Sequence, residues 1–139
     1  MAAETIVFPD VENAARLHLA AAFAARAGFT TVTATAGTKP ATLPTEFVHI
    51  TRTGGTASLV IDRPQITVQT YAKTGARSVA IAQMARAILA AAARDGALGT
   101  VTVYALNELS GPYSDPDPNA PTHVRYSATV QLAVRGTAA

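Results

Sequence analysis

The stretch from Arg63 to Gly96 constrains the fold most, because its hydrophobic period changes from two residues to about 3.6. Residues 66–71 (Ile-Thr-Val-Gln-Thr-Tyr) alternate between two faces and are rich in β-branched side chains, which predicts a strand. Residues 73–75 interrupt this pattern. Beyond them, apolar residues recur at helical spacing in one stripe, formed by Ile81, Met84, Ala85, Ile88, Leu89 and Ala92. A strand that leads into a long helix with one apolar face predicts a helix packed on a sheet.

Capping residues mark the two ends of this helix. Ser78 can accept a hydrogen bond as the N-cap, and Thr74 and Gly75 are competing positions. Asp95 and Gly96 end the helix, because glycine suits the left-handed conformation just past a helix C-terminus.

An earlier helix is predicted to begin at Asp10, a favourable N-cap, and to stop at Gly28. Its apolar stripe consists of Val11, Ala15, Leu19, Ala22 and Phe23. Glu12 and Arg16 have the i,i+4 spacing of an ion pair. His18 lies at the edge of the stripe without a second ligand or base at suitable spacing. We therefore interpret it as a partly buried, hydrogen-bonded residue rather than a ligand or a catalytic group.

Two strands are predicted next, over residues 29–36 and 47–52, with a proline-containing loop at residues 37–46 between them. Gly54 and Gly55 follow. A glycine pair between two strand patterns predicts a two-residue hairpin, here leading into a further strand at residues 57–61. A phosphate cradle is the alternative interpretation of the pair, but no helix N-terminus and no Lys-Ser/Thr pair follows it.

The C-terminal third is predicted to hold strands at residues 100–106 and 124–135, separated by a loop at residues 110–122. This loop contains four prolines, which a central strand does not tolerate. A connection of this length is either functional or a disordered connector. Asp115, Asp117 and Asn119 resemble the start of a calcium loop, but the required glycine and distal glutamate are missing, so no metal site is predicted.

These elements predict a single domain over residues 1–139 of the α/β (α+β) class, with a mixed or mostly antiparallel β-sheet and two main helices packed on it. Only 14 % of the residues are charged, against roughly 25 % in a typical globular domain. The deficit favours surface that is buried in an assembly. An alanine-biased composition without that meaning is the alternative explanation.

Several classes of function lack their usual signals. The net charge is +2 and no run of Lys or Arg occurs, whereas a nucleic-acid-binding protein usually shows a basic stripe. The absence of cysteine excludes disulfides and thiol chemistry. Residues 1–4 lack the pattern of a signal peptide, and no apolar run is expected to span a bilayer. The three histidines form no nucleophile–base constellation, so we expect neither an enzyme nor a cofactor.

Several short motifs follow one another along nearly the whole chain. They are Phe8-Pro9-Asp10, Thr51-Arg52-Thr53-Gly54-Gly55, Asp62-Arg63-Pro64, Thr74-Gly75-Ala76, Ser110-Gly111-Pro112 and Arg125-Tyr126. Each motif is short and unspecific by itself. Their order resembles that of the tail terminator proteins of long-tailed bacteriophages, particularly the actinobacteriophage type.

This resemblance implies an α/β domain that forms a homohexameric ring at the head-proximal end of the phage tail tube. Such a ring stops tube polymerisation and provides a docking surface for the neck. The implied partners are further copies of the chain, the major tail tube protein and the head completion (stopper) protein. DNA would pass through the ring without specific binding, and no membrane is involved. The implied location is the neck region of the virion tail, and the host cytoplasm during assembly.

Two alternatives remain at this point. One is another phage head–tail joining or tail-completion protein, and the other is a small ligand-binding or enzymatic α+β domain with its site beside the long helix. The candidate partner-binding residues are Arg52, Gly54, Gly55, Arg63, Tyr113, Asp115 and Asp117. Gly54 and Gly55 lie in the tip of the predicted hairpin, which Arg52 and Arg63 flank. Tyr113 offers an amphipathic anchor, and the two carboxylates offer charge that selects a partner.

Overall fold

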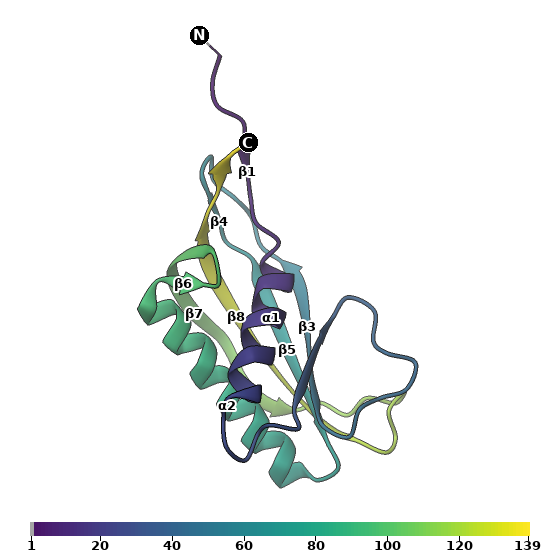
Figure 1. Cartoon of the computed structure of the whole chain (residues 1–139). Coiled ribbons are helices and arrows are strands. Elements are labelled where there is room, and N and C mark those ends of the chain that lie inside the picture. The colour runs from purple at the N-terminus through teal and green to yellow at the C-terminus, as the bar shows by residue number, and fades with distance from the viewer. Residues whose placement is uncertain (1) are drawn as a thin grey trace.

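A computed structural model describes residues 2–139 of the chain. Two helices, α1 (Val11–Ala24) and α2 (Gly75–Asp95), pack on the same face of a curled sheet (Figure 1). The core lies between this face and the two helices. The predicted single-domain α+β class is therefore confirmed.

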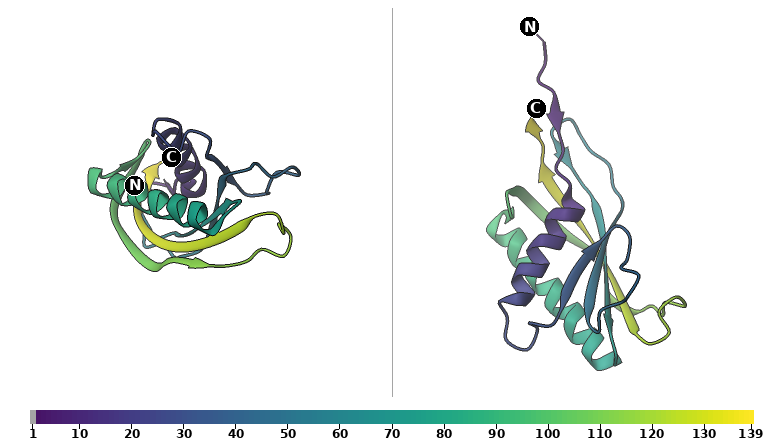
Figure 2. Two further views of the ribbon diagram at one scale, coloured as in Figure 1. Left: turned by 90° about the horizontal axis from the view of Figure 1, so that it is seen from below. Right: turned by 45° about the vertical axis from the view of Figure 1, so that its right-hand side comes forward.

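The main sheet has the strand order β2-β3-β5-β8-β7-β6. These strands are β2 (Thr33–Ala36), β3 (Phe47–Gly54), β5 (Gln65–Ala72), β8 (Val124–Arg135), β7 (Val101–Ser114) and β6 (Ala97–Leu98). Only β2 and β3 are parallel, so the sheet is mixed and mostly antiparallel, as predicted. Two short pairings lie outside this order: β4 (Ile61–Asp62) pairs with β8, and β1 (Ile6–Val7) pairs with β9 (Thr137–Ala138). Viewed from below, β7 and β8 curve around α2 (Figure 2).

Helix α1 begins as its sequence predicts, because the Asp10 side chain accepts a hydrogen bond from the backbone N–H of Asn13 at 3.1 Å. The helix ends at Ala24, four residues before Gly28. The predicted Glu12–Arg16 pair is wrong. Arg16 donates instead to the Asn13 side chain, and Glu12 accepts from the backbone N–H of Arg52 at 2.9 Å.

Helix α2 carries the predicted apolar stripe, which is buried against the sheet. Its N-cap is Thr74, one of the two competing positions, and not Ser78. Ser78 is buried one turn further on and donates to the Thr70 carbonyl at 3.0 Å. Gly96 adopts the expected left-handed conformation. By length and composition α2 is apolar enough to cross a membrane, a test that core helices of soluble proteins also pass.

Three strand predictions need correction. Of the strand expected over residues 57–61, only an isolated bridge at Ala57 and the first residue of β4 form. The strand expected over residues 29–36 forms only at Thr33–Ala36. The loop expected over residues 110–122 begins later, because β7 continues to Ser114 and passes through Pro112. The outer edge of β7 is paired only near its start, by β6, and bulges interrupt its pairing with β8 around this proline. A proline is tolerated there because its missing N–H removes no ladder hydrogen bond at an open edge.

Candidate interaction surfaces

The candidate partner-binding residues fall into two groups at opposite ends of β5 and β8. Arg52, Gly54, Gly55 and Arg63 lie where β3 ends and β5 begins. Tyr113, Asp115 and Asp117 lie at the other end, between β7 and β8. The structure therefore brings together the members of each group but keeps the two groups apart.

The first group lies at the base of a projection that we call the arm, formed by β1, β9 and residues 55–64 (Figure 2). Strands β1 and β9 pair with each other, and the backbone N–H of Ala139 donates to the Thr5 carbonyl at 2.8 Å. The backbone N–H of Gly136 donates to the Val60 carbonyl, also at 2.8 Å. Backbone hydrogen bonds thus join three separate segments of the chain in the arm.

The predicted two-residue hairpin at Gly54 and Gly55 is wrong. Strand β3 pairs with β5 and not with residues 57–61, and the chain turns at residues 58–61 instead. Both glycines nevertheless have positive φ, at 140° and 98°. A Cβ on Gly55 would overlap the backbone carbonyl of Arg63, so this position requires glycine for the close approach as well as for its φ. The glycine pair thus marks where the chain leaves the sheet.

A bidentate ion pair fixes the arm to the sheet. The Arg52 guanidinium donates to the two Asp62 carboxylate oxygens at 2.7 and 3.0 Å, and to the Gly54 carbonyl at 3.1 Å. The Asp62 side chain is almost fully buried. This hydrogen bonding raises the pKa of Arg52 above its ordinary value. Arg52 was expected to face a partner, but its guanidinium is used within the chain, whereas Arg63 is exposed.

The second group belongs to a projection that we call the lobe, formed by residues 37–46 and 113–123. Asp117 is its centre. One Asp117 carboxylate oxygen accepts from Lys39 Nζ at 2.9 Å and from the Tyr71 hydroxyl at 2.8 Å. The other accepts from the backbone N–H of Asn119 at 2.9 Å. The loop is therefore held in one conformation, which does not fit the disordered-connector alternative.

Asp117 lies inside the lobe and not on its surface. Its side chain is only 5 % exposed. Burial by itself raises the pKa of this carboxyl, but the hydrogen bonds from Lys39, Asn119 and Tyr71 outweigh burial and lower the pKa to about 2. The carboxylate is thus ionised at neutral pH and is satisfied within the chain. The expectation that it selects a partner does not fit this position.

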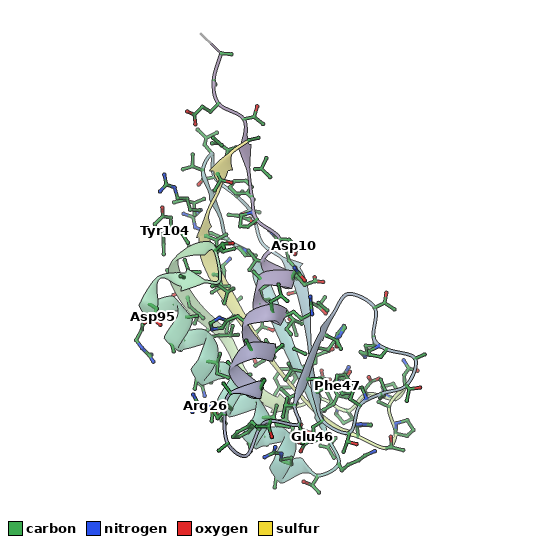
Figure 3. The ribbon with its side chains drawn as sticks, in the orientation of Figure 1. Asp10, Arg26, Glu46, Phe47, Asp95 and Tyr104 are labelled. Carbon is green, nitrogen blue, oxygen red and sulfur yellow. The ribbon has the colours of Figure 1, made fainter. Side chains whose placement is uncertain are left out.

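Aromatic stacking and further hydrogen bonds complete the lobe. The Phe47 and Tyr71 rings stack at 4.4 Å between centroids, beside the lobe (Figure 3 labels Phe47). Nε2 of His123 donates to the Pro44 carbonyl at 2.8 Å, which joins the two segments of the lobe. Arg125 Nε donates to the Asp115 carbonyl at 2.6 Å. These residues were not predicted from the sequence to belong to a site.

Tyr113 and Asp115 differ in their availability. Tyr113 lies in β7 opposite Ser127, and about half of its surface is exposed. The Asp115 carboxylate accepts from the Ser127 hydroxyl at 2.7 Å and pairs with Arg125 at 3.3 Å. Tyr113 is therefore the residue of this group that is free to contact a partner.

The middle of the sheet face opposite the helices carries threonine side chains. Thr51, Thr67 and Thr129 are aligned across β3, β5 and β8. The Thr67 and Thr129 hydroxyls lie 3.1 Å apart, and the Thr53 and Thr67 hydroxyls 3.3 Å apart. Because these hydroxyls pair with one another, covering this face leaves fewer polar groups unsatisfied.

Of the hollows beside α2, two have volumes of about 290 and 380 Å³, and the one under the helix is small. It lies between the helix and strands β5, β7 and β8, and it has a volume of about 10 Å³. Arg86 and Glu108, which line it, form a bidentate pair at 2.6 and 2.7 Å. A volume of this size holds about one water molecule. Residues 2–139 contain no cluster of three His, Asp or Glu side chains placed to hold a metal ion.

Comparison with protein-family models and with curated protein sequences finds no match for this chain. The chemistry of the two projections therefore has to be interpreted from this structure and from the order of motifs in the sequence.

Proposed function

We propose that this chain is the ring-forming tail terminator of a long-tailed bacteriophage. In this role, copies of the chain assemble into a ring on the head-proximal end of the tail tube. The ring stops tube polymerisation and offers its free side to the head completion protein of the neck. The chain acts as a structural protein of the virion, without catalysis or a cofactor.

The observation that carries the proposal is the pair of braced projections at opposite ends of one compact body (Figure 1). A subunit in a ring between a tube and a neck needs contacts in several directions at once. Ion pairs and backbone hydrogen bonds hold both the arm and the lobe in place. Such pre-organised segments lose little conformational entropy on binding, which favours assembly. The order of motifs along the whole chain supports the same role.

The use of the charged residues also supports a structural role. Five basic side chains form ion pairs within the chain: Lys39, Arg52, Arg77, Arg86 and Arg125. Depletion of free charge is typical of the central part of protein–protein interfaces. The hollow between α2 and strands β5, β7 and β8 has room for a water molecule but not for a substrate.

The first test is the size of the purified protein. Light scattering is expected to give a mass near six times that of the 14.3 kDa chain, and electron microscopy is expected to show rings. A monomer at all accessible concentrations would contradict the proposal.

The second test uses a phage that lacks this gene. We expect overlong tails that do not join heads, and normal tails after complementation. Tails of normal length that still fail to join heads would favour the other head–tail joining role.

Tyr113→Ser is the matched surface variant for the lobe, with Thr122→Ser as its control. Both positions are exposed, so both variants are expected to fold. The tyrosine variant is expected to impair docking to the tube or the neck, because it removes an aromatic anchor. The threonine variant removes one methyl group from the same lobe, and we expect it to complement normally. If Tyr113→Ser also complements fully, Tyr113 is not a docking residue.

A further inference from the structure

The arm presents an unusually exposed apolar side chain at its turn. Leu59 is 92 % exposed, and the adjacent Val60 is half exposed. Val60, which follows Leu59 in the turn, lines a hollow at the base of the arm together with Tyr104. Figure 3 shows Tyr104 on this side of the body. Contiguous exposed apolar side chains mark contact sites more reliably than single ones.

This turn is rigid. The backbone N–H of Ser58 donates to the Ile61 carbonyl at 2.8 Å, and that of Arg63 donates to the Thr56 carbonyl at 3.1 Å. The Arg52–Asp62 pair and the hydrogen bond from Gly136 to Val60 hold it from outside. A leucine held out into water by a braced turn gains no burial within its own chain. It is instead pre-organised to enter an apolar groove.

A groove of suitable character lies elsewhere on the same chain. It runs between α1 and the turn from β6 to β7 and has a volume of about 520 Å³. Its apolar lining consists of Pro9, Ala14, Leu17, Ala21, Leu98 and Val101. Leu17 is half exposed there. The volume lies within the roughly 300–1,000 Å³ of clefts that bind ligands.

The charges of the turn and the groove are opposite. Within residues 55–64, Asp62 is paired with Arg52, whereas Arg63 is exposed and forms no ion pair with any residue in the described part of the chain. Asp10 is the only carboxylate that lines the groove, and no Lys or Arg lines it. Asp10 is exposed at the start of α1 (Figure 3). Complementary charge of this kind fixes the orientation of a contact more than its strength.

We propose that the Leu59–Val60 turn of one copy binds in the α1 groove of the next copy, with Arg63 facing Asp10. The inference rests on the proposed ring, since it names the contact that joins neighbouring subunits. The two surfaces differ, so the contact is heterologous, and repeating it generates a closed ring or an open filament but not a symmetric dimer.

Cysteine cross-linking tests this contact directly, because the chain has no cysteine of its own. The variant Leu59→Cys with Leu17→Cys places one thiol on each proposed surface. After mild oxidation, we expect a ladder of covalent oligomers on a denaturing gel. Each single cysteine variant is expected to remain monomeric on that gel. Leu59→Cys with Thr122→Cys is the control, because Thr122 is exposed in the lobe, and no ladder is expected from it.

Two substitutions give an independent measurement. Leu59→Asp is expected to raise, at least tenfold, the protein concentration at which half of the chains are assembled. Arg63→Ala and Asp10→Asn are each expected to weaken assembly. The double variant is expected to weaken assembly no further than the single variant with the larger effect, because both changes remove the same contact. Asparagine at position 10 keeps the N-cap while it removes the charge. Circular dichroism verifies that each variant is folded.

The outcomes separate this contact from the proposed function. Rings of normal size that form with Leu59→Asp, without cross-links in the double cysteine variant, would overturn the contact but leave the ring intact. Dimers from Leu59→Cys alone would also overturn it, because they indicate a symmetric contact. A wild-type chain that stays monomeric would reject the ring itself, and with it this contact.

Discussion

Asp117→Asn is expected to destabilise the protein by about 2 kcal/mol at pH 7. The carboxylate accepts hydrogen bonds from Lys39, Tyr71 and the backbone of Asn119, and its side chain is 5 % exposed. Its pKa falls from 3.8 to about 2 in the folded state. At about 1.4 kcal/mol for each pKa unit, this difference corresponds to about 2 kcal/mol of stability.

The pH dependence gives the test its sign. A carboxyl whose pKa is lower in the folded state stabilises the protein fully above its unfolded pKa of 3.8. That contribution is lost as the pH falls through about 2. The difference in unfolding free energy between wild type and Asp117→Asn should therefore be constant from pH 7 to 5 and shrink toward pH 2. Urea denaturation, followed by circular dichroism at several pH values, measures this difference.

Glu108→Gln is the matched control. It makes the same acid-to-amide change in the ion pair between Glu108 and Arg86. The side chains of both residues are much more exposed than that of Asp117. Exposed pairs contribute about 0–1 kcal/mol, so a small effect is expected. If Asp117→Asn costs no more than this control at pH 7, the lobe is not anchored by Asp117. A difference that stays unchanged down to pH 2.5 would also refute the linkage argument.

Three further predictions concern the core, the arm and DNA. Ile88→Asp should abolish cooperative thermal unfolding, because Ile88 is buried in the core and an unpaired buried charge costs several kcal/mol. A soluble variant with a normal melting transition would show that α2 packs differently. Replacing both Gly54 and Gly55 by valine should lower the free energy of unfolding by roughly 1–3 kcal/mol through backbone strain. Gly55→Ala alone should cost more than Gly54→Ala, since only Gly55 lies against the Arg63 carbonyl, and equal denaturation midpoints would contradict this. In gel-shift assays, any DNA binding should be weak, unspecific and lost steeply as salt is raised, whereas tight binding that survives competitor DNA at physiological salt would be the opposite result.

Much of the fold followed from local pattern. The period of the apolar residues correctly predicted both helices, and the alternation of residues 66–71 correctly predicted β5, because burial on one face imposes the same period on sequence and structure. Gly96 is likewise local, since its left-handed φ depends on its missing side chain. These features need no knowledge of distant residues.

The predictions that were wrong concern segments whose structure depends on pairing with residues far away in the sequence. The glycine pair at Gly54 and Gly55 favours a hairpin locally, but β3 pairs with β5 along most of its length when the chain makes a longer excursion through the arm. Pro112 argues against a strand only where that strand is paired with a neighbouring strand on each side. Nothing in the local sequence shows that β7 has an open edge there. Strand order is thus the information that local patterns lack.

The assignment of surface charges failed for a related reason. Asp115 and Asp117 were expected to face a partner because they lie in a polar, proline-rich segment. Asp117 is instead paired with Lys39, far away in the sequence, and Asp115 is paired with Arg125 at the start of the next strand. In a chain with so few charges, each ion pair that braces a projection leaves one charge fewer for a partner. The candidate contact surfaces of the arm and the lobe expose chiefly Leu59, Val60 and Tyr113. Their specificity must come chiefly from apolar side chains held in fixed positions, such as Leu59 and Tyr113, and only secondarily from single charges such as Arg63.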